Sequence, residues 1–311
     1  MSWQQQQAAI MTDQLSGAVD ITRATAQMLM SFAKEETTNS LTDMSARLRQ
    51  IAREVLTAQS GMASPVSLFN RVFFAVGAEA DVDAARLLLE DTAQRFLQEQ
   101  TTARDSLCRK ATALIPDRVS ILTHSASSTV LQTLLHASEA GRHPTITCLE
   151  ARPLYEGRQL AARLAENNID ATLIIDSAAY AILQNVEIVL LGADSLTKDG
   201  VISKVGSGGL AVCAQSLGIP CYFLADTSKV WPDALGSQPV HERAPASVWP
   251  DAPENVKVRN LFYDLTPWTA VSGIMTEQGL LTAGEIRAQC RDQPAHPWLQ
   301  TIVAEVRSSV F

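Results

Sequence analysis

The feature that most constrains the fold is a repeated alternation, after Pro116, of short apolar runs with amphipathic segments. The apolar runs, which predict β-strands, are residues 119–123, 146–149, 171–175, 186–191 and 222–225. The segments between them, which predict helices, are residues 128–140, 157–167, 177–184 and 208–218. Strict alternation of strand and helix is typical of a parallel sheet covered on both faces. We therefore predict a doubly wound α/β fold for this part of the chain.

The chain before Pro116 has a different pattern. Its apolar residues recur at steps of three and four, glycine is scarce and β-branched runs are absent. This pattern predicts an all-helical domain of four to six helices. We expect the helical domain to span residues 1–115 and the α/β domain to span residues 116–311, ending in a helix over 297–310.

A proline-rich stretch, residues 231–253, interrupts the second domain and is predicted to be a long loop or arm. It contains Trp231 and Trp249, and exposing two tryptophans to water is unfavourable. We expect them to lie at a subunit contact or to pack over the edge of the sheet.

Composition excludes several classes of protein. The net charge of -8 and a sequence pI near 5.2 argue against coating nucleic acid or an anionic membrane, both of which favour clustered Lys and Arg. The five cysteines are widely spaced and odd in number, so neither a disulfide framework nor a zinc site is expected. No run of 18 apolar residues occurs, and the Gln-rich start lacks the regions of a signal peptide. We expect a cytoplasmic protein with no metal, no cofactor and no direct contact with nucleic acid or membrane.

Polar residues follow the predicted strands, at the carboxyl ends where open α/β sheets bind ligands. These residues are His124, Ser125, Glu150, Arg152, Asp176 and Asp194. Asp194 follows a long apolar run, where burying a carboxylate is costly, and this favours a functional role. Structural roles stay open for the others: His124 as a hydrogen-bonded strand-end residue, Asp176 as a helix cap, and Glu150 with Arg152 as an ion pair.

Lys204 precedes a glycine-rich turn, residues 206–209, that opens a predicted helix. A helix start presents backbone N–H groups and the positive end of a dipole to an anion. We expect Lys204, Gly206 and Ser207 to bind the polar end of a ligand, although helix packing also requires small residues. Because no Gly-x-Gly-x-x-Gly follows the first strand, a dinucleotide-dependent oxidoreductase is disfavoured.

These residues together resemble the family that joins the alpha, beta and delta subunits of eukaryotic translation initiation factor 2B to methylthioribose-1-phosphate isomerase and archaeal ribose-1,5-bisphosphate isomerase. The resemblance runs from about Gly17 to Glu285 and is carried by residues 121–124, 150–153 with Gly157, 176–178, 192–195, 204–206, 260–267 and 276–279. It implies a helical N-terminal domain and a Rossmann-like C-terminal domain. It also implies a homodimer or hexamer, with a pocket between the domains for a phosphorylated ribose or a nucleotide.

The resemblance implies a catalytic pair at Ser125 and Asp194. The isomerases have cysteine at the first position, and a thiol with a pKa near 8.5 can exchange a proton near neutral pH. A serine hydroxyl cannot do so without a strong base beside it, so isomerase activity is in question.

A second departure lies in the helical domain, where the isomerases use two arginines to grip phosphate. Here serine replaces both arginines, at Ser16 before Gly17 and at Ser64 before Pro65. Any phosphate would then depend on Ser16, Gly17, Ser64 and Ser67 together with backbone amides, Arg152 and Lys204.

Two hypotheses follow. In the first, the protein is an aldose-ketose isomerase acting on a phosphorylated ribose derivative, with Asp194 as general acid or base and Ser125 as a hydrogen-bond partner or proton relay. In the second, it is a non-catalytic regulatory or assembly subunit, like those of the initiation factor, whose pocket senses a sugar phosphate or nucleotide.

Overall fold

The computed structural model describes residues 1–308 and divides the chain into two compact units. We call them the helical unit, made of residues 1–102, 228–241 and those from 288 onward, and the sheet unit, made of residues 103–227 and 242–287. This division differs from the single boundary predicted at residues 115 and 116. The chain enters the sheet unit within a long helix, and two later segments return to the helical unit.

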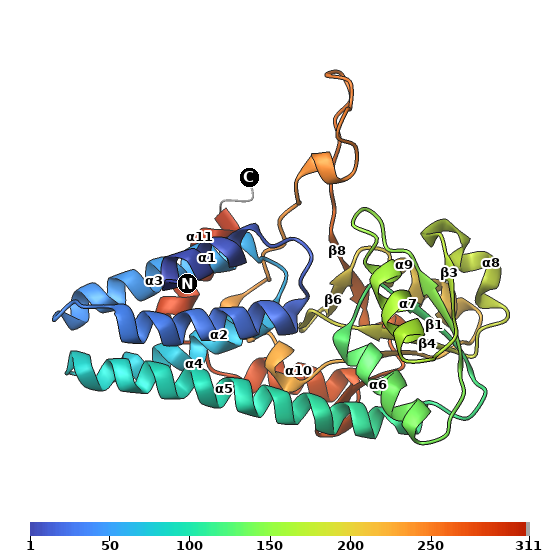
Figure 1. Ribbon diagram of the computed structural model, residues 1–311, viewed down its shortest axis with the longest axis horizontal. Helices are drawn as coiled ribbons and strands as arrows, with labels where there is room; N and C mark the ends of the chain where they lie inside the picture. The colour runs from blue at the N-terminus through green and yellow to red at the C-terminus, as the bar shows by residue number, and fades with distance from the viewer. Residues whose placement is uncertain (309–311) are drawn as a thin grey trace. The chain divides into compact units, whose positions relative to one another are not determined.

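The helical unit contains the predicted helices (Figure 1). They are α1 (Trp3–Thr12), α2 (Ala18–Glu35), α3 (Leu41–Ala58), α4 (Ala63–Val76), the first part of α5 (Val82–Ala111) and α11 (Pro297–Ser308). Side-chain caps begin several of them; for example, Ser2 forms a capping box with Gln5, and the Ser40 hydroxyl accepts a hydrogen bond from the Asp43 amide. The predicted all-helical character is confirmed; residues 309 and 310 of the expected final helix lie outside the described residues.

Helix α11 belongs to the helical unit, although it follows the α/β part in sequence. One face of α11 is buried against α3 and α4, and the residues of that face are Leu299, Ile302, Val303 and Val306. Trp231 is also buried in the helical unit, with its indole N–H donating to the Gly236 carbonyl at 2.7 Å. Burial of these apolar side chains explains why both segments join the helices.

The sheet unit is built on a central sheet that, within residues 1–308, has seven strands in the order β10-β9-β7-β4-β1-β2-β3. Their bounds are β1 (Ser120–His124), β2 (Thr145–Leu149), β3 (Ala171–Ile174), β4 (Ile188–Gly192), β7 (Cys221–Leu224), β9 (Gly273–Thr276) and β10 (Gly279–Leu281). All neighbours are parallel except β10, which is antiparallel to β9. The five predicted strands are present within two residues, and the predicted parallel-sheet α/β fold is confirmed. The order of the six parallel strands is that of dinucleotide-binding folds, with its switch point between β1 and β4.

A second, antiparallel sheet in the order β5-β6-β8 was not predicted. Its strands are β5 (Ser195–Leu196), β6 (Gly200–Lys204) and β8 (Tyr263–Pro267). They are too short for a clear alternating pattern, and β8 pairs with a segment far away in the sequence. The register places Lys204 opposite Tyr263 and Ser203 opposite Asp264.

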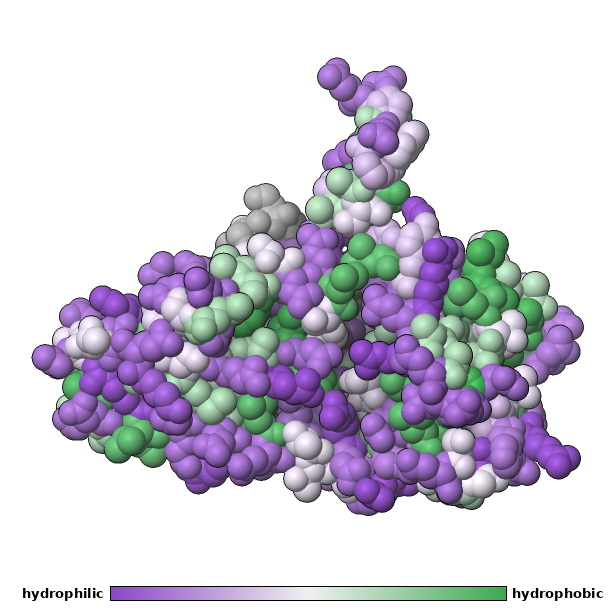
Figure 2. Space-filling model, in the orientation of Figure 1, coloured by the Kyte–Doolittle hydropathy of each residue, from purple (hydrophilic) through white to green (hydrophobic). Residues whose placement is uncertain are grey.

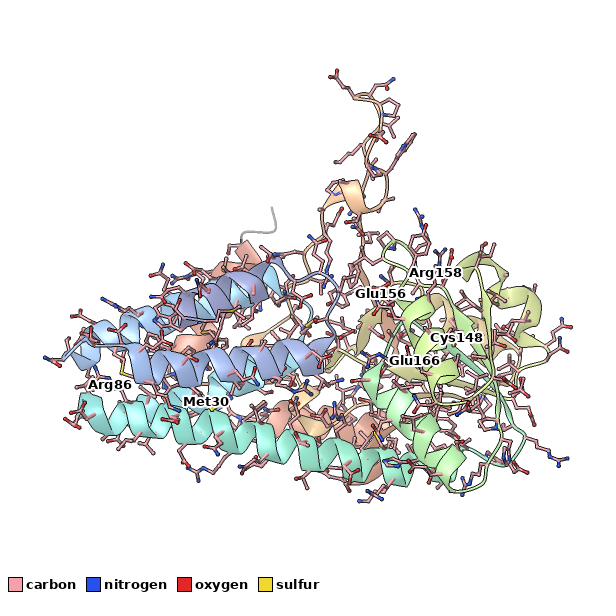
Figure 3. The ribbon with its side chains drawn as sticks, in the orientation of Figure 1. Met30, Arg86, Cys148, Glu156, Arg158 and Glu166 are labelled. Carbon is pink, nitrogen blue, oxygen red and sulfur yellow. The ribbon has the colours of Figure 1, made fainter. Side chains whose placement is uncertain are left out.

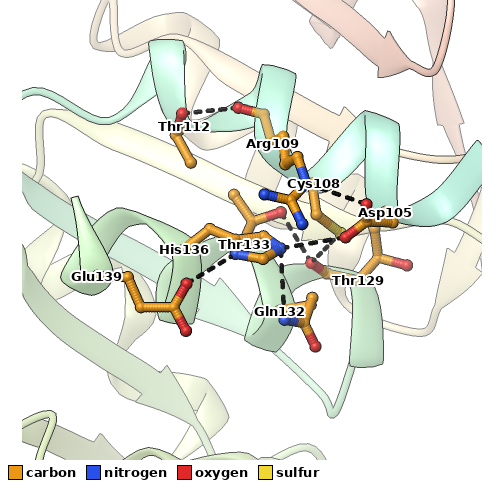
Figure 4. Close-up of polar contacts among 9 residues, drawn as sticks. All are labelled: Asp105, Cys108, Arg109, Thr112, Thr129, Gln132, Thr133, His136 and Glu139. Atoms are coloured by element: carbon orange, nitrogen blue, oxygen red, sulfur yellow. Dashed lines mark hydrogen bonds and ion pairs between the residues drawn. The ribbon is translucent and has the colours of Figure 1, made fainter.

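Helices connect strands of the sheet unit: α6 (Ser128–Glu139), α7 (Glu156–Glu166), α8 (Ala179–Leu183) and α9 (Ser207–Ser216). Helix α10 (Ala283–Asp292) follows β10 and begins in the sheet unit. The last turns of α5 bind α6 through polar contacts (Figure 4). His136 Nδ1 lies 3.1 Å from Glu139 Oε2, and its Nε2 lies 3.6 Å from Asp105 Oδ1. The Cys108 thiol lies 3.5 Å from the Thr129 carbonyl. The His136–Glu139 pair lies within α6, and the contacts of Asp105 and Cys108 attach the end of α5 to α6.

Buried thiols line both sides of the sheet. Burial raises the pKa of Cys148 and of Cys221 to about 12, so both stay protonated at neutral pH. Among residues 1–308, none of the helices combines the length and apolar character that a membrane span requires.

Residues 242–260, which we call the arm, project from the sheet unit above β8 (Figure 1). Its two ends are joined by a Glu242–Arg259 ion pair and by a hydrogen bond from the Arg243 amide to the Asn260 carbonyl at 3.0 Å. Trp249 is 46% exposed on this arm, whereas Trp231 is buried in the helical unit. A subunit contact for Trp249 therefore stays a prediction, while Trp231 is accounted for by packing within the chain.

Candidate functional site

The switch point of the sheet brings the ends of β1 and β4 into direct contact. A Cβ added at Gly192 would lie 2.4 Å from Ser127 Oγ, so only glycine fits at the end of β4. Ser125 has a φ of 66°, a left-handed conformation that is unfavourable for a residue with a side chain and that clusters at functional sites. Asp194 follows β4, is half-buried, and donates its amide to the Ile202 carbonyl at 2.9 Å.

Asp194 lies beside Tyr263. Burial raises the pKa of the Tyr263 phenol, and the negative charge of Asp194 raises it further. The phenol therefore stays protonated and can act as a hydrogen-bond donor at this edge of the sheet. Tyr263 was not singled out from the sequence, because a tyrosine in an apolar segment is usually a core residue.

Lys204 is held by a carboxylate that sequence reasoning missed, Glu156. Lys204 Nζ lies 2.9 Å from Glu156 Oε1, and the two residues are only 4% and 5% exposed. Lys204 Nζ also lies 3.6 Å from the centroid of the Phe262 ring. Burial lowers the pKa of Lys204, and the charge of Glu156 opposes that shift. The expected role of Lys204 in binding the polar end of a ligand stays a prediction; within the fold its charge is paired with that of Glu156.

Glu156, which is labelled in Figure 3, is the first residue of α7. An acidic residue in the first turn of a helix is common because it complements the helix dipole, so the sequence gives no signal for a buried role. Its second oxygen, Oε2, is buried and has no hydrogen-bond partner within residues 1–308.

Arg243, at the base of the arm, is another residue that sequence reasoning missed. Its guanidinium carbon lies 3.6 Å from the Phe262 ring centroid, and Nη2 donates to the Tyr263 hydroxyl at 3.2 Å. Phe262 thus contacts two cations, Lys204 and Arg243, through its negative π face. The proline-rich sequence around Arg243 predicted only an arm.

His124 is buried at the end of β1, with 2% of its side chain exposed. Nε2 lies 2.8 Å from the Val205 carbonyl, and Nδ1 lies 3.8 Å from Asp176 Oδ1. Burial is the largest effect on its pKa and lowers it, so the ring is neutral at physiological pH.

The glycine-rich turn before α9 binds a side chain of the protein itself. Gly206 N donates to Asp264 Oδ2 at 2.7 Å, and Gly208 N donates to Asp264 Oδ1 at 3.1 Å. The Ser207 hydroxyl, which is buried, donates to Ser203 Oγ at 3.4 Å. Our expectation that these amides and Gly206 present an open anion site is corrected, because Asp264 already occupies the start of the helix.

Arg152 is exposed, and its guanidinium contacts the Tyr155 hydroxyl and the Val248 carbonyl, the latter at 3.2 Å. Its amide donates to Asp176 Oδ2 at 2.7 Å, and the Ala151 amide donates to Oδ1 at 2.8 Å. Asp176 therefore fixes the loop after β2. The suggested Glu150–Arg152 pair is not the one formed, since Glu150 binds Arg158 at 2.9 Å.

The serines predicted to bind ligand in the helical unit are engaged within that unit. The Ser64 hydroxyl lies 2.9 Å from Ser228 Oγ and accepts a hydrogen bond from Gln100 Nε2 at 2.7 Å. The Ser67 hydroxyl donates to the Ser228 carbonyl at 2.7 Å. In the ligand-free chain these hydroxyls attach residues 228–241 to α4, and their expected role in binding phosphate stays a prediction.

Ser16 and Gly17 lie at the start of α2. Ser16 donates its amide to Asp13 Oδ1 at 2.9 Å, and Gly17 is the N-cap residue of α2 with open space around it. In residues 1–308, no group of three or more His, Cys, Asp and Glu side chains is placed to hold a metal ion.

Comparison with known proteins gives a consistent result. The model of the initiation factor 2 subunit family matches residues 14–283. A putative translation initiation factor eIF-2B subunit 2-like protein from Pyrococcus horikoshii is 32% identical over 271 residues, which cover 86% of this chain and 92% of that protein. A ribose 1,5-bisphosphate isomerase from Haloferax volcanii is 33% identical over 277 residues, covering 86% of this chain and 85% of the isomerase.

The fold agrees as well. The crystal structure of the translation initiation factor eIF-2B from Pyrococcus horikoshii OT3 aligns with a TM-score of 0.78 and 28% identity, covering 90% of this chain and 96% of that one. Sequence, strand order and structural similarity therefore lead to one conclusion: the chain belongs to the initiation factor 2 subunit family.

Proposed function

We propose that this protein binds a phosphorylated ribose derivative at the carboxyl edge of its parallel sheet and isomerises it from aldose to ketose. The observation that carries the proposal is Asp194 at the switch point, whose charge acts on the protonated Tyr263 phenol. Tyr263 pairs in register with Lys204, which is bound to Glu156. A carboxylate next to a neutral donor can take a proton from one sugar carbon while an oxygen is held by a hydrogen bond. Relatives named as isomerases, which match 86% of the chain, support the proposal.

The residues have separate roles in this reaction. Asp194 is the general acid or base that moves a proton between neighbouring sugar carbons, and Ser125 binds a sugar oxygen or relays the proton. His124 and the Lys204–Glu156 pair orient the sugar hydroxyls, and the exposed Arg152 attracts the phosphate. One carbon is oxidised as its neighbour is reduced, so the reaction needs no external oxidant.

The test is the variant Asp194→Asn, assayed for ketose formation from ribose 1,5-bisphosphate and from methylthioribose 1-phosphate. Loss of a general acid or base should lower turnover about 100-fold or more, while the affinity for the sugar phosphate stays within about tenfold. Asp199→Asn, at an exposed aspartate, is the matched control and should keep full activity. Unchanged turnover in Asp194→Asn would count decisively against the assignment.

Ser125 favours a second candidate function, a non-catalytic subunit that binds a sugar phosphate or nucleotide and regulates an assembly. The relative from Pyrococcus horikoshii that is named as initiation-factor-like supports this alternative. The variant Ser125→Cys separates the two. Turnover in the wild type supports the isomerase, whereas ligand binding without turnover in the wild type, with turnover gained by Ser125→Cys, supports the regulatory subunit. Absence of binding of both sugar phosphates and nucleotides, in the wild type and in Ser125→Cys, would refute both.

A further inference from the structure

His124 presents a buried acceptor atom that the described chain does not satisfy. Its Nδ1 is buried and has no hydrogen-bond partner within residues 1–308. Buried polar atoms are almost always paired, so an unpaired one requires an explanation. The explanation begins with the proton on the other ring nitrogen.

The neighbour of Nε2 determines which nitrogen carries that proton. Nε2 lies 2.8 Å from the Val205 carbonyl, and a carbonyl oxygen can only accept. Nε2 must therefore carry the hydrogen, which leaves a lone pair on Nδ1 in the neutral ring. The Asp176 carboxylate is 3.8 Å from Nδ1, and its two oxygens already accept the amides of Ala151 and Arg152. A carboxylate cannot donate a hydrogen bond. The Nδ1 lone pair therefore requires a hydrogen-bond donor from outside the chain.

The Val205 carbonyl is itself fixed by the turn that follows it. Val205 N donates to the Phe262 carbonyl at 2.9 Å, and Asp264 accepts the amides of Gly206 and Gly208. Gly206 has a φ of 102°, and a Cβ there would lie 3.2 Å from His124 Nε2. Asp264 lies on β8 opposite Ser203 of β6, and Val205 directly follows β6. The pairing of β6 with β8 therefore fixes the Asp264 carboxylate relative to the Val205 carbonyl.

We propose that Asp264 is a positioning residue: by binding the amides of Gly206 and Gly208 it fixes the Val205 carbonyl, which holds His124 in the Nε2–H tautomer and keeps Nδ1 as an acceptor for a ligand hydroxyl group. The ligand part rests on the proposed function; the tautomer does not. The start of α9 then serves to orient His124 and does not bind the ligand phosphate.

Four charged groups from different elements surround the ring. Asp176 after β3 and Glu156 on α7 favour the protonated form of His124, and Lys204 at the end of β6 opposes it. Asp264 on β8 is the fourth: burial raises the pKa of its carboxyl group, and the amides of Gly206 and Gly208 and the interaction with His124 oppose that shift. Burial outweighs the attraction to these carboxylates, which agrees with a neutral ring.

The tautomer can be measured on the ligand-free protein by NMR of ring nitrogens after labelling histidine with nitrogen-15, with His124→Gln used to assign the signal. The wild type should show a neutral Nε2–H tautomer at pH 7, and Asp264→Asn should keep it because an amide oxygen can still accept. Asp264→Ala should mix the two tautomers, whereas Asp199→Ala, at an exposed aspartate, should change nothing. If Asp264→Ala does not fold, Gly206→Ala takes its place: the added Cβ lies against His124 and should shift the turn, so the two tautomers should mix here too. A doubly protonated ring or an Nδ1–H tautomer in the wild type, or an unchanged tautomer in Asp264→Ala, overturns the proposal.

Binding of ribose 1,5-bisphosphate provides the second measurement. Asp264→Ala should weaken binding about tenfold, and Asp264→Asn should stay within about threefold of the wild type. Equal affinity in all three proteins overturns the ligand part of the proposal. If the tautomers behave as expected but the wild type binds neither ribose 1,5-bisphosphate nor methylthioribose 1-phosphate, the proposed function fails while the positioning role of Asp264 stands.

Discussion

The carboxyl edge of the sheet and the start of α4 in the helical unit both contain residues that the sequence marked as ligand-binding, but their hydrogen bonding differs. At the start of α4, Ser64 and Ser67 bond to Ser228 and Gln100 of the same unit. At the sheet edge, His124 Nδ1 and Glu156 Oε2 are buried without a partner in residues 1–308. A polar side chain is therefore the better candidate for binding when the fold leaves it unsatisfied.

The two regions also differ in charge. The serine cluster is neutral, whereas the sheet edge buries Lys204 and Glu156 and places Arg243 on the same aromatic ring as Lys204. Buried ions are unfavourable unless they are paired, so changes at the sheet edge should have larger effects than changes at the serines.

The largest effect is expected for Lys204→Met, which leaves Glu156 buried without its cation. The free energy of unfolding should fall by about 3–5 kcal/mol, the usual result of breaking a buried pair on one side. Chemical denaturation measures it. The double variant Glu156→Gln with Lys204→Met should recover part of the loss, and a double variant no more stable than the single one would contradict a direct pair.

A smaller effect is expected for Gly206→Ala, which forces an alanine into a left-handed conformation and brings its Cβ against His124. We expect a loss of about 1–3 kcal/mol in the free energy of unfolding. Gly209→Ala is the matched control, since Gly209 lies in α9 with open space around it, and it should stabilise the protein by about 0.5–1 kcal/mol. Equal melting temperatures for the two variants would show that the turn does not require glycine at position 206.

Ser64→Ala tests the serine cluster. It removes the hydrogen bonds to Gln100 and Ser228, while Gln100 keeps a 3.2 Å bond to Ser228 Oγ, so the loss should be about 1–2 kcal/mol. Affinity for ribose 1,5-bisphosphate should be unchanged, because the hydroxyl serves the fold. Ser177→Ala, at an exposed serine, is the control; a clear loss of affinity in Ser64→Ala without loss of stability would restore the phosphate role.

The smallest effect is a dependence of stability on pH that comes from His124. Burial lowers its folded pKa below 6.5, so the unfolded chain binds the proton first, and stability falls as the pH drops below about 6.5. The free energy of unfolding of His124→Gln should have a shallower slope between about pH 6.5 and 5, by up to about 1.4 kcal/mol per pH unit. The pKa of His296 is also lowered by burial, but this residue is present in both proteins and cancels. Identical slopes would contradict a neutral, buried His124.

The sequence by itself was sufficient for the secondary structure that depends on local pattern. The five apolar runs became β1, β2, β3, β4 and β7, because buried parallel strands need continuous apolar stretches. The position of Asp194 at the end of β4 followed from the same rule, since a carboxylate after such a run marks the end of a strand. The family was also recognisable from short motifs in a fixed order.

Only the tertiary structure decided which polar groups meet. Glu156 and Lys204 are 48 residues apart, and Gly206 and Asp264 are 58 residues apart, so no local pattern could pair them. The hydrophobic patch over β3 and α8 in Figure 2, which includes Leu173 and Ile175, likewise depends on which strand forms the edge of the sheet. Pairing, burial and unsatisfied acceptors are properties of the packed chain, because they depend on where distant segments come together and exclude water.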